Sequence, residues 1–255
     1  MNVFLRIART EVLEQRRQPW MIFILAANYA LWIAIFGVLF LGVDSVSSQP
    51  DTLAWLKHQL PGIELDAFMR LATSTFGSLS FTNLPWYVAI MSGTSVLHDR
   101  ECGTMPFLML APVTRGQLLA GKLAGAMCIP LVLHLVFVGT SSLLLGRVGS
   151  LAPFADKFGS SPAWWVAFLL GAPASAAFVG ALGTVISALS RDVRTSMQYT
   201  SFFIGLLSLG IGAALVDGIS QGALVQLAFA SGCLVATVAT VFVGARLISK
   251  DVAAT

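Results

Sequence analysis

The sequence predicts an all-helical (all-α) membrane protein, and two observations carry this prediction. Of the 255 residues, 56% are hydrophobic and only 11% are charged, whereas a soluble domain usually carries about 25% charged residues. The apolar residues also gather in runs that reach the roughly 20 residues a helix needs to cross a bilayer. We therefore expect a single transmembrane domain over residues 1–255. The net charge of +3 is small and does not suggest a nucleic-acid partner.

Six apolar runs are long enough to be transmembrane helices. An even number of spans places both termini on the same side, and Lys and Arg concentrate on the cytosolic side of a membrane protein. The segments on the side of the termini hold eleven of the fifteen Lys and Arg residues. We therefore expect both termini to be cytosolic. The runs occupy about residues 20–42, 71–97, 123–145, 163–189, 196–216 and 223–247.

The segments on either side of the first run differ in character. In residues 1–19, apolar side chains such as Phe4, Ile7 and Val12 recur at helical spacing with Arg and Glu between them. This pattern predicts an amphipathic helix lying in the headgroup region, with an ordinary cytosolic turn as the alternative. Residues 43–70 form the longest outer segment, where turn residues alternate with short amphipathic pieces.

The second run is unusually polar, because residues 71–97 include ten Ser, Thr and Asn side chains. Polar groups at bilayer depth usually face protein or water rather than lipid. This helix is therefore expected to line a translocation path or a helix interface, and close packing through Ser and Gly without any path is the alternative. The candidate path residues are Ser78, Thr82, Asn83 and Tyr87.

The loop over residues 98–122 is predicted to form a helix end, a short helix and a new helix start. Gly103 breaks the second span, and Thr104 is placed to cap a short helix that Pro112 then stops. The spacing Thr114-x-x-Gln117 fits a capping box, so the next helix should begin there.

The short helix of this loop is rich in large apolar side chains. Five of them on about two turns cannot all face one side, so some must meet something other than water. An apolar helix seated in the groove of a partner is one solution, and a helix lying on the membrane surface is the alternative. The five are Met105, Phe107, Leu108, Met109 and Leu110.

The stretch HDRECGTMPFLMLAPVTRGQLLAGK resembles the cytosolic loop of type-2 ABC exporter permeases. It departs from that pattern at Pro106–Phe107, where the family often has Leu–Glu. The N-terminal helix, the six spans and the hairpin LSRDVRTSMQ also look like this family, and LLGAPASAAFVGALGTVISAL is similar to the haem-export permease B of cytochrome c maturation. The matching loop residues are Glu101, Gly103, Thr104, Leu108, Pro112, Thr114, Arg115, Leu118, Leu119, Gly121 and Lys122.

The resemblance implies a permease of the bacterial inner membrane that has no ATPase site of its own. Such permeases pair, commonly as homodimers, and each copy binds a cytosolic ATPase subunit that holds ATP and Mg, so a complex has two ATPase copies. The short loop helix would be the coupling helix, and spans two and five would line the interface between permease copies. The implied docking residues are Glu101, Gly103, Thr104, Phe107, Leu108, Pro112, Thr114 and Arg115, joined by Arg191, Asp192 and Arg194 of the second cytosolic hairpin.

Other chemical sites find little support in the sequence. Gly116 to Lys122 matches the start of a phosphate-binding loop, but Leu123 stands where a Ser or Thr should contact magnesium. ATP hydrolysis is therefore expected in a partner. His134 lies inside the third run and is interpreted as a buried hydrogen-bonding residue rather than a haem or metal ligand, while Trp164 and Trp165 are interpreted as interface anchors.

Two other functions stay open from the residues alone. A secondary transporter that works without an ATPase often has inverted repeats and charged residues at the midplane. Here the loop after the second run is about 25 residues and the link after the fourth about six, so the two halves do not match. A structural membrane partner of an assembly is the other alternative. The transported substrate is not predicted by any residue pattern.

Overall fold

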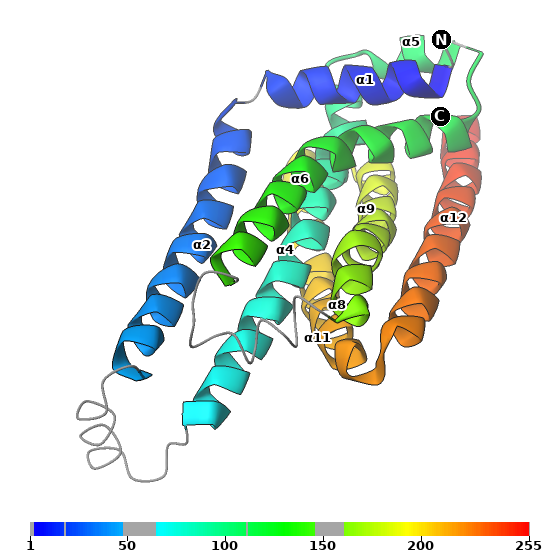
Figure 1. The fold of residues 1–255 in the computed structure, drawn as a ribbon. Coiled ribbons are helices and arrows are strands. Elements are labelled where there is room, and N and C mark those ends of the chain that lie inside the picture. Colours follow the sequence, from blue (N-terminus) through cyan, green and yellow to red (C-terminus); the bar gives the residue numbers. More distant parts are fainter. Residues whose placement is uncertain (1–2, 18, 48–64, 111, 146–160, 255) are drawn as a thin grey trace.

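The computed structural model describes residues 3–17, 19–47, 65–110, 112–145 and 161–254, and all regular elements in these ranges are helical (Figure 1). Two of the elements, η2 and η3, are single π-helical turns within longer helices. In chain order the elements are α1 (Val3–Arg16), α2 (Pro19–Ser47), α4 (Leu65–Glu101), α5 (Met105–Leu110), α6 (Arg115–Leu145), α8 (Pro162–Val166), η2 (Ala167–Gly171), α9 (Ala172–Leu189), α10 (Val193–Tyr199), η3 (Thr200–Ile204), α11 (Gly205–Gln221) and α12 (Ala223–Ala254).

Within the described residues, four helices are long and apolar enough to cross a membrane. They overlap the last four predicted runs, and a shorter apolar stretch, Ile22–Ile35, lies in the first. The helix of the second run, α4, is continuous but contains many hydroxyl and amide side chains, and it is not one of these four helices. The count of six spans therefore stays a prediction. The four helices are Arg115–Ser141, Pro162–Leu189, Val193–Ile219 and Ala223–Ile248.

The long helices lie side by side, and α1 crosses one end of the bundle (Figure 1). The same end carries α5, the start of α6 and the last turns of α12 (Figure 1). We call this the α1–α5 end. Of the predicted outer segment 43–70, residues 43–47 are in α2 and residues 65–70 are in α4, both at the opposite end of the bundle (Figure 1), and residues 48–64 lie outside the described residues.

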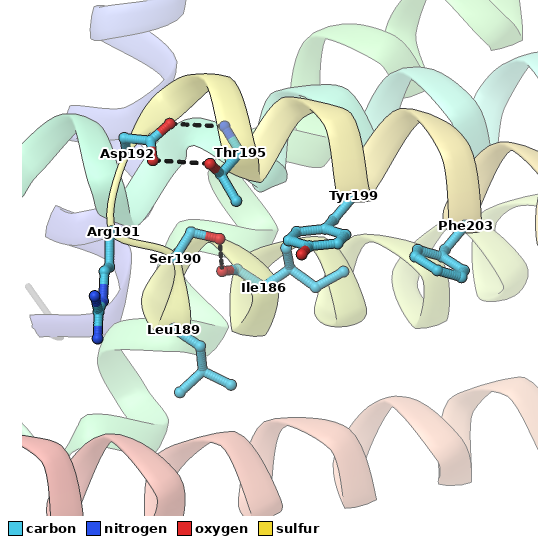
Figure 2. Close-up of a pocket in the computed structure, with 8 residues that line it drawn as sticks. All are labelled: Ile186, Leu189, Ser190, Arg191, Asp192, Thr195, Tyr199 and Phe203. Atoms are coloured by element: carbon cyan, nitrogen blue, oxygen red, sulfur yellow. Dashed lines mark hydrogen bonds between the residues drawn. The ribbon is translucent and has the colours of Figure 1, made fainter.

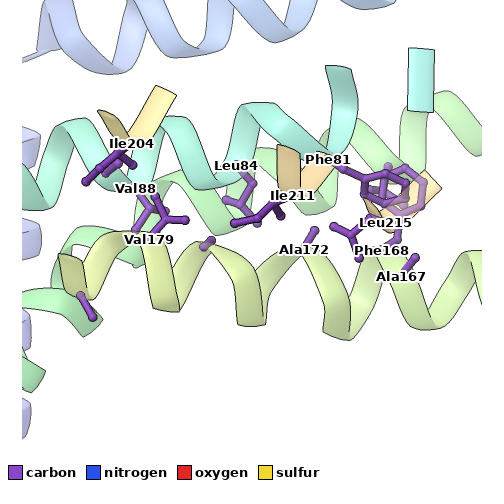
Figure 3. Close-up of a cluster of buried hydrophobic side chains, with 14 of the residues drawn as sticks. Phe81, Leu84, Val88, Ala167, Phe168, Ala172, Val179, Ile204, Ile211 and Leu215 are labelled. Carbon is purple, nitrogen blue, oxygen red and sulfur yellow. The ribbon is translucent and has the colours of Figure 1, made fainter. Parts of the chain in front are cut away.

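The core of the bundle is centred on the contact between α4 and α9 (Figure 3). Small residues of α9 allow this close approach: a methyl group added to Gly183 would lie 2.9 Å from the backbone carbonyl oxygen of Ala89. Larger side chains fill the far end of the core, where the ring of Phe168 packs against those of Phe81 and Trp164 at 4.6 and 4.5 Å between centroids. Small residues at helix contacts are the usual packing solution in membranes, where lipid is as apolar as Leu.

The π-helical turn η2 precedes Pro173, which lies at the beginning of α9. Proline has no N–H, so it cannot donate to the carbonyl one turn earlier, and a local widening of the helix is a common response. This turn places Phe168 and Ala167 in the core.

The interpretation of Trp164 as an interface anchor is wrong. Trp164 is 4% exposed and packs edge-on against Phe81 and Phe168 inside the core, whereas Trp165 is half-buried at its edge. A Trp near a predicted span end suits both the membrane interface and a core position, and only the rotation of the helix decides between them.

Candidate docking site at the α1–α5 end

The break after α4 forms as the sequence predicts. Gly103 has φ of +68°, a left-handed conformation that glycine adopts without the steric cost of a side chain. The amide of Thr104 then donates to the carbonyl of Asp99 at 2.9 Å, which closes the end of α4. The chain thereby turns out of α4 and enters α5 within three residues of Glu101.

The two expected caps differ in outcome. The capping box is confirmed, because the amide of Thr114 donates to Gln117 Oε1 at 3.0 Å and the amide of Gln117 donates to Thr114 Oγ1 at 3.2 Å. Thr104 occupies the N-cap position of α5, because its carbonyl accepts from the amide of Leu108 at 3.2 Å, but its hydroxyl is directed to the end of α4. This hydroxyl instead donates to the carbonyl and to Oδ1 of Asp99, at 3.1 and 3.2 Å, so Thr104 ties the start of α5 to the end of α4.

Helix α5 divides its apolar side chains between two directions, as its composition predicts. Met105 is buried and Leu108 is half-buried against a small core that includes Ile7. Phe107 and Leu110 are 74% and 83% exposed. α5 therefore has an inner face that anchors it and an outer apolar face, Phe107 and Leu110, that the rest of the described chain leaves uncovered.

The remaining docking residues surround this outer face. Glu101 and Pro112 are exposed, and Arg115 is half-buried at the start of α6. Between α1 and α5 lies a groove of about 490 Å³, which we call the α1–α5 groove. It is lined by Val3, Arg6, Ile7, Thr10, Glu14, Asp99, Thr104, Phe107, Leu108, Pro112, Val113 and Lys122.

A buried cluster of charges lies below the α1–α5 groove, and we call it the Lys122 cluster. The ammonium group of Lys122 on α6 lies 2.6 Å from Glu11 Oε2 on α1 and 2.8 Å from Asp99 Oδ2 on α4. Glu14 is more distant, at 3.9 Å, and its side chain is 31% exposed. Lys122 also donates to the backbone carbonyl of Ser95 at 3.2 Å. Three helices therefore meet at one ammonium group.

Burial and the charge of Lys122 have opposite effects on the pKa of Glu11. Removal from water raises the pKa of its carboxyl group, and the charge and hydrogen bond of Lys122 lower it, but the effect of burial is the larger. Glu11 reaches this depth because α1 lies against glycines of α6: Gly125 contacts Glu11 Cβ, and a methyl group at Gly121 would lie 2.9 Å from a methyl group of Ile7. Gln15 adds a hydrogen bond from Nε2 to the Gly125 carbonyl at 3.3 Å.

The buried side of α1 is therefore more polar than the expected amphipathic pattern. Ile7, Glu11 and Gln15 face the protein, while Leu5 and Leu13 are 53% and 45% exposed. The helix itself is confirmed, and its location in the headgroup region stays a prediction.

The hairpin that the sequence predicts to be the second cytosolic one joins α9 to α10 through residues 190–192. Asp192 caps α10, since its Oδ1 accepts from the amide of Thr195 and its Oδ2 from the Thr195 hydroxyl, both at 2.8 Å. These hydrogen bonds lower the pKa of Asp192. Arg191 and Arg194 are exposed, and Arg100 of α4 donates to the Ser190 carbonyl at 3.4 Å, which ties the hairpin to the α1–α5 end.

An open groove of about 470 Å³ lies beside this hairpin (Figure 2). The rings of Tyr199 and Phe203 follow one another along the helix and stack with 6.1 Å between centroids (Figure 2). Arg191 and Asp192 lie at the hairpin end of the groove, so one end is charged and the rest is apolar (Figure 2).

The four candidate path residues all lie on α4. The structure describes Ser78 only as part of this helix, and it places the Thr82 hydroxyl 3.3 Å from the carbonyl of Ser208 on α11. Asn83 Nδ2 is buried without a hydrogen-bond partner among the described residues. The ring of Tyr87 lies 5.8 Å from that of Tyr29 on α2. Thr82 and Tyr87 therefore face two different helices of the same chain, α11 and α2.

His134 of α6 is fully buried, with its ring 5.7 Å from that of Phe168. In the part of the chain that the structure describes, no group of three or more His, Cys, Asp or Glu side chains is arranged to hold a metal ion.

No sequence pattern predicts a role for Glu11 or Asp99, and Lys122 is predicted only as part of the loop pattern. One signal was present: a lysine at the beginning of a long apolar run needs a counter-charge when it is buried. Which acidic residue supplies it depends on the placement of α1 and α4 against α6, and no local pattern encodes that placement.

The long apolar helices pack around small residues, which defines a helical membrane protein. The short helix α5, between α4 and α6 in the chain, exposes an apolar face that a partner could cover. Comparison with known proteins gives the family. The family model described as ABC-2 family transporter protein matches residues 5–209, and the chain belongs to this family. The chain is also 27% identical over 224 residues to the "Probable ABC transporter permease protein NosY" of Pseudomonas aeruginosa, an alignment that covers 87% of this chain and 74% of that protein. The recognition of an ABC transporter permease is thus confirmed.

Proposed function

We propose that this chain is the permease subunit of an ABC exporter that moves its substrate outward by coupling to ATP hydrolysis in a separate nucleotide-binding subunit. Membership of the ABC-2 family supports the membrane subunit. The similarity to a probable ABC transporter permease supports the same class. The direction of transport and the ATPase partner are the parts that we propose.

The outer apolar face of α5 is the observation that carries the proposal. Phe107 and Leu110 project from a six-residue helix whose inner face is anchored by Met105. Burying a large apolar side chain contributes roughly 1.5–3 kcal/mol, so two such residues give a partner groove an appreciable docking energy. The tie between Thr104 and Asp99 fixes the direction in which this face points.

The complete exporter is proposed to contain two copies of this chain and two ATPase subunits. Each copy would have six spans with both termini in the cytosol of a bacterial cell, placed in the inner membrane. The exposed side chains of Phe202, Phe203 and Leu206 on η3 and α11 support a contact with a second copy or with lipid. Asn83 Nδ2, which has no hydrogen-bond partner among the described residues, and the hydroxyl side chains of α4 support a path for a substrate with hydrogen-bonding groups.

The test is purification of the full chain from its native membrane in mild detergent, with an assay for Mg-dependent ATPase activity. The pair Phe107→Asp and Leu110→Asp should abolish co-purification of the ATPase, because both carboxylates would be desolvated in the groove. The matched control, Phe107→Leu with Leu110→Met, keeps an apolar face and should retain the ATPase. Leu108 is unsuitable as the test residue, because its half-buried side chain also packs on the core.

Two results would count against the proposal. Purification of the wild-type chain without any ATPase, under several detergents, would favour a carrier that works alone. Equal ATPase recovery with the Asp pair and with the apolar control would show that α5 is not the docking helix.

A further inference from the structure

A continuous chain of polar contacts runs from α5 to α1. The Thr104 hydroxyl, at the start of α5, donates to Asp99 Oδ1 at 3.2 Å. The other oxygen of Asp99 lies 2.8 Å from Lys122 Nζ, and Lys122 Nζ lies 2.6 Å from Glu11 Oε2. The contacts thus pass through α4 and α6 and end on α1, a helix far from α5 in the sequence.

The polar contacts add to an apolar link between the two helices, because Met105 and Leu108 of α5 pack in one cluster with Ile7 of α1. The α1–α5 groove separates much of their length, with Ile7 on one wall and Leu108 and Val113 on the other. Asp99 and Lys122 lie at the bottom of this groove and are 3% and 4% exposed. A buried ion pair resists separation, because pulling it apart leaves an uncompensated charge in a medium of low dielectric constant.

We propose that Thr104, Asp99, Lys122 and Glu11 are positioning residues that make α1 and α5 move as one unit. The inference rests on the proposed function: when a partner displaces α5 through Phe107 and Leu110, the ion pairs carry α1 along. Because only residues 17 and 18 separate α1 from α2 in the sequence, a displacement of α1 reaches the first long helix, while α4 and α6 receive it through Asp99 and Lys122.

The chain provides a matched pair of variants for this idea. Glu11 and Glu14 lie on the same helix and carry the same charge, but only Glu11 is in short contact with Lys122 and buried. Glu11→Met keeps the Cβ–Cγ stem that packs on Gly125 and removes the link. Glu14→Met makes the same chemical change and leaves the link in place. Lys122 keeps Asp99 as a counter-charge in both variants, so neither leaves a buried ammonium group unpaired.

The measurement is the distance between α5 and α1 by pulsed electron spin resonance on the full chain in lipid nanodiscs. One spin label is placed on the exposed native Cys102, in the turn that leads from α4 into α5, and the other on Arg9→Cys of α1; the distance between them is called the α5–α1 distance. Cys128→Ser and Cys233→Ala remove the other two cysteines. A second pair joins Arg9→Cys to Leu224→Cys, an exposed position at the start of α12. Both pairs are measured on the chain alone and on its complex with the co-purified ATPase, without nucleotide and with a trapped ATP analogue.

We expect a narrow distribution of α5–α1 distances in the parent chain and in Glu14→Met, and a broad distribution in Glu11→Met. In the ATPase complex, the nucleotide should shift the α1–α12 distance in the parent and leave the α5–α1 distance unchanged, and Glu11→Met should lose the first of these effects. A narrow α5–α1 distance in Glu11→Met, or a nucleotide shift of that distance in the parent, overturns the proposal. If no ATPase binds, the proposed function fails, whereas the arm on the chain alone still decides whether the link exists.

Discussion

Two long helices, Pro162–Leu189 and Ala223–Ile248, are similarly apolar but occupy opposite environments. The first helix includes α9, and 67% of the residues in its most apolar part are buried within the chain. The second helix belongs to α12, and only 11% of the residues in its most apolar part are buried. In a membrane, apolar character alone does not drive a helix into the protein, because lipid is equally apolar. The size of the side chains separates the two helices more clearly than their hydrophobicity does.

Small side chains mark the protein-facing surface in both helices. α9 presents Ala, Gly and Ser to α4 over nearly its whole length. The large side chains of α12, such as Val235 and Val238, are about 70% exposed. Its narrow inner stripe, apart from Ile248, is again built from smaller or polar residues: Gln226, Ala230, Cys233 and Gly244.

The largest expected effect comes from adding bulk to a glycine of α9. Gly183→Leu should destabilise the protein by about 3 kcal/mol or more, because the new side chain meets the backbone of α4 at Ala89 and Gly93, which cannot move aside without shifting the helix. The matched change on α12, Gly232→Leu, meets nothing within 4 Å and should be tolerated. Thermal unfolding in detergent, followed by loss of the monodisperse peak in size-exclusion chromatography, measures both. Similar melting temperatures for the two variants would contradict the packing role of α9.

A smaller effect is expected at Gln226, where α12 does enter the core. Gln226 is 1% exposed, and its Nε2 donates to the Leu215 carbonyl at 2.7 Å while its side chain lies against Gly218. Gln226→Leu should destabilise the protein by about 1 kcal/mol, since hydrogen bonds between membrane helices average about 0.6 kcal/mol and reach about 1.7. The exposed Gln221→Leu, which breaks only a contact with Asp217 at the end of α11, is the control and should change the melting temperature less.

A feature of the fold or of the docking site can be predicted from the sequence when the residues that form it lie within a few positions of one another. Gly103, Thr114 and Gln117 act within a few residues, and the break and the capping box that they predict are present. The hydroxyl of Thr104 was expected to accept from a helix amide, but it donates to Asp99, a carboxylate in the last turn of the preceding helix. Local rules describe turns and caps well and fail where a second polar group is equally close.

The Lys122 cluster shows the other limit. Glu11 and Lys122 are 111 positions apart, and pairing them requires the crossing of α1 over α6 at Gly121 and Gly125. The same holds for the environment of Trp164. Residue type predicts that a buried charge needs a counter-charge and that a Trp lies in the core or at the membrane interface. The arrangement of several helices decides which counter-charge and which of the two environments.

The smallest effect is expected at the cap that fixes where α9 ends and α10 begins. Asp192→Ala removes both acceptors used by Thr195 and should lower the melting temperature slightly, whereas Asp192→Asn keeps an acceptor and should lower it less. Because these hydrogen bonds lower the pKa of Asp192 in the folded protein, its contribution is present above the ordinary value of 3.8 and is lost as the pH falls through the lower folded value. The difference in melting temperature between the wild type and Asp192→Asn should therefore shrink in acid. A difference that grows on acidification would show that Asp192 does not act as a charged cap, and the boundary between α9 and α10 would then depend on packing rather than on this carboxylate.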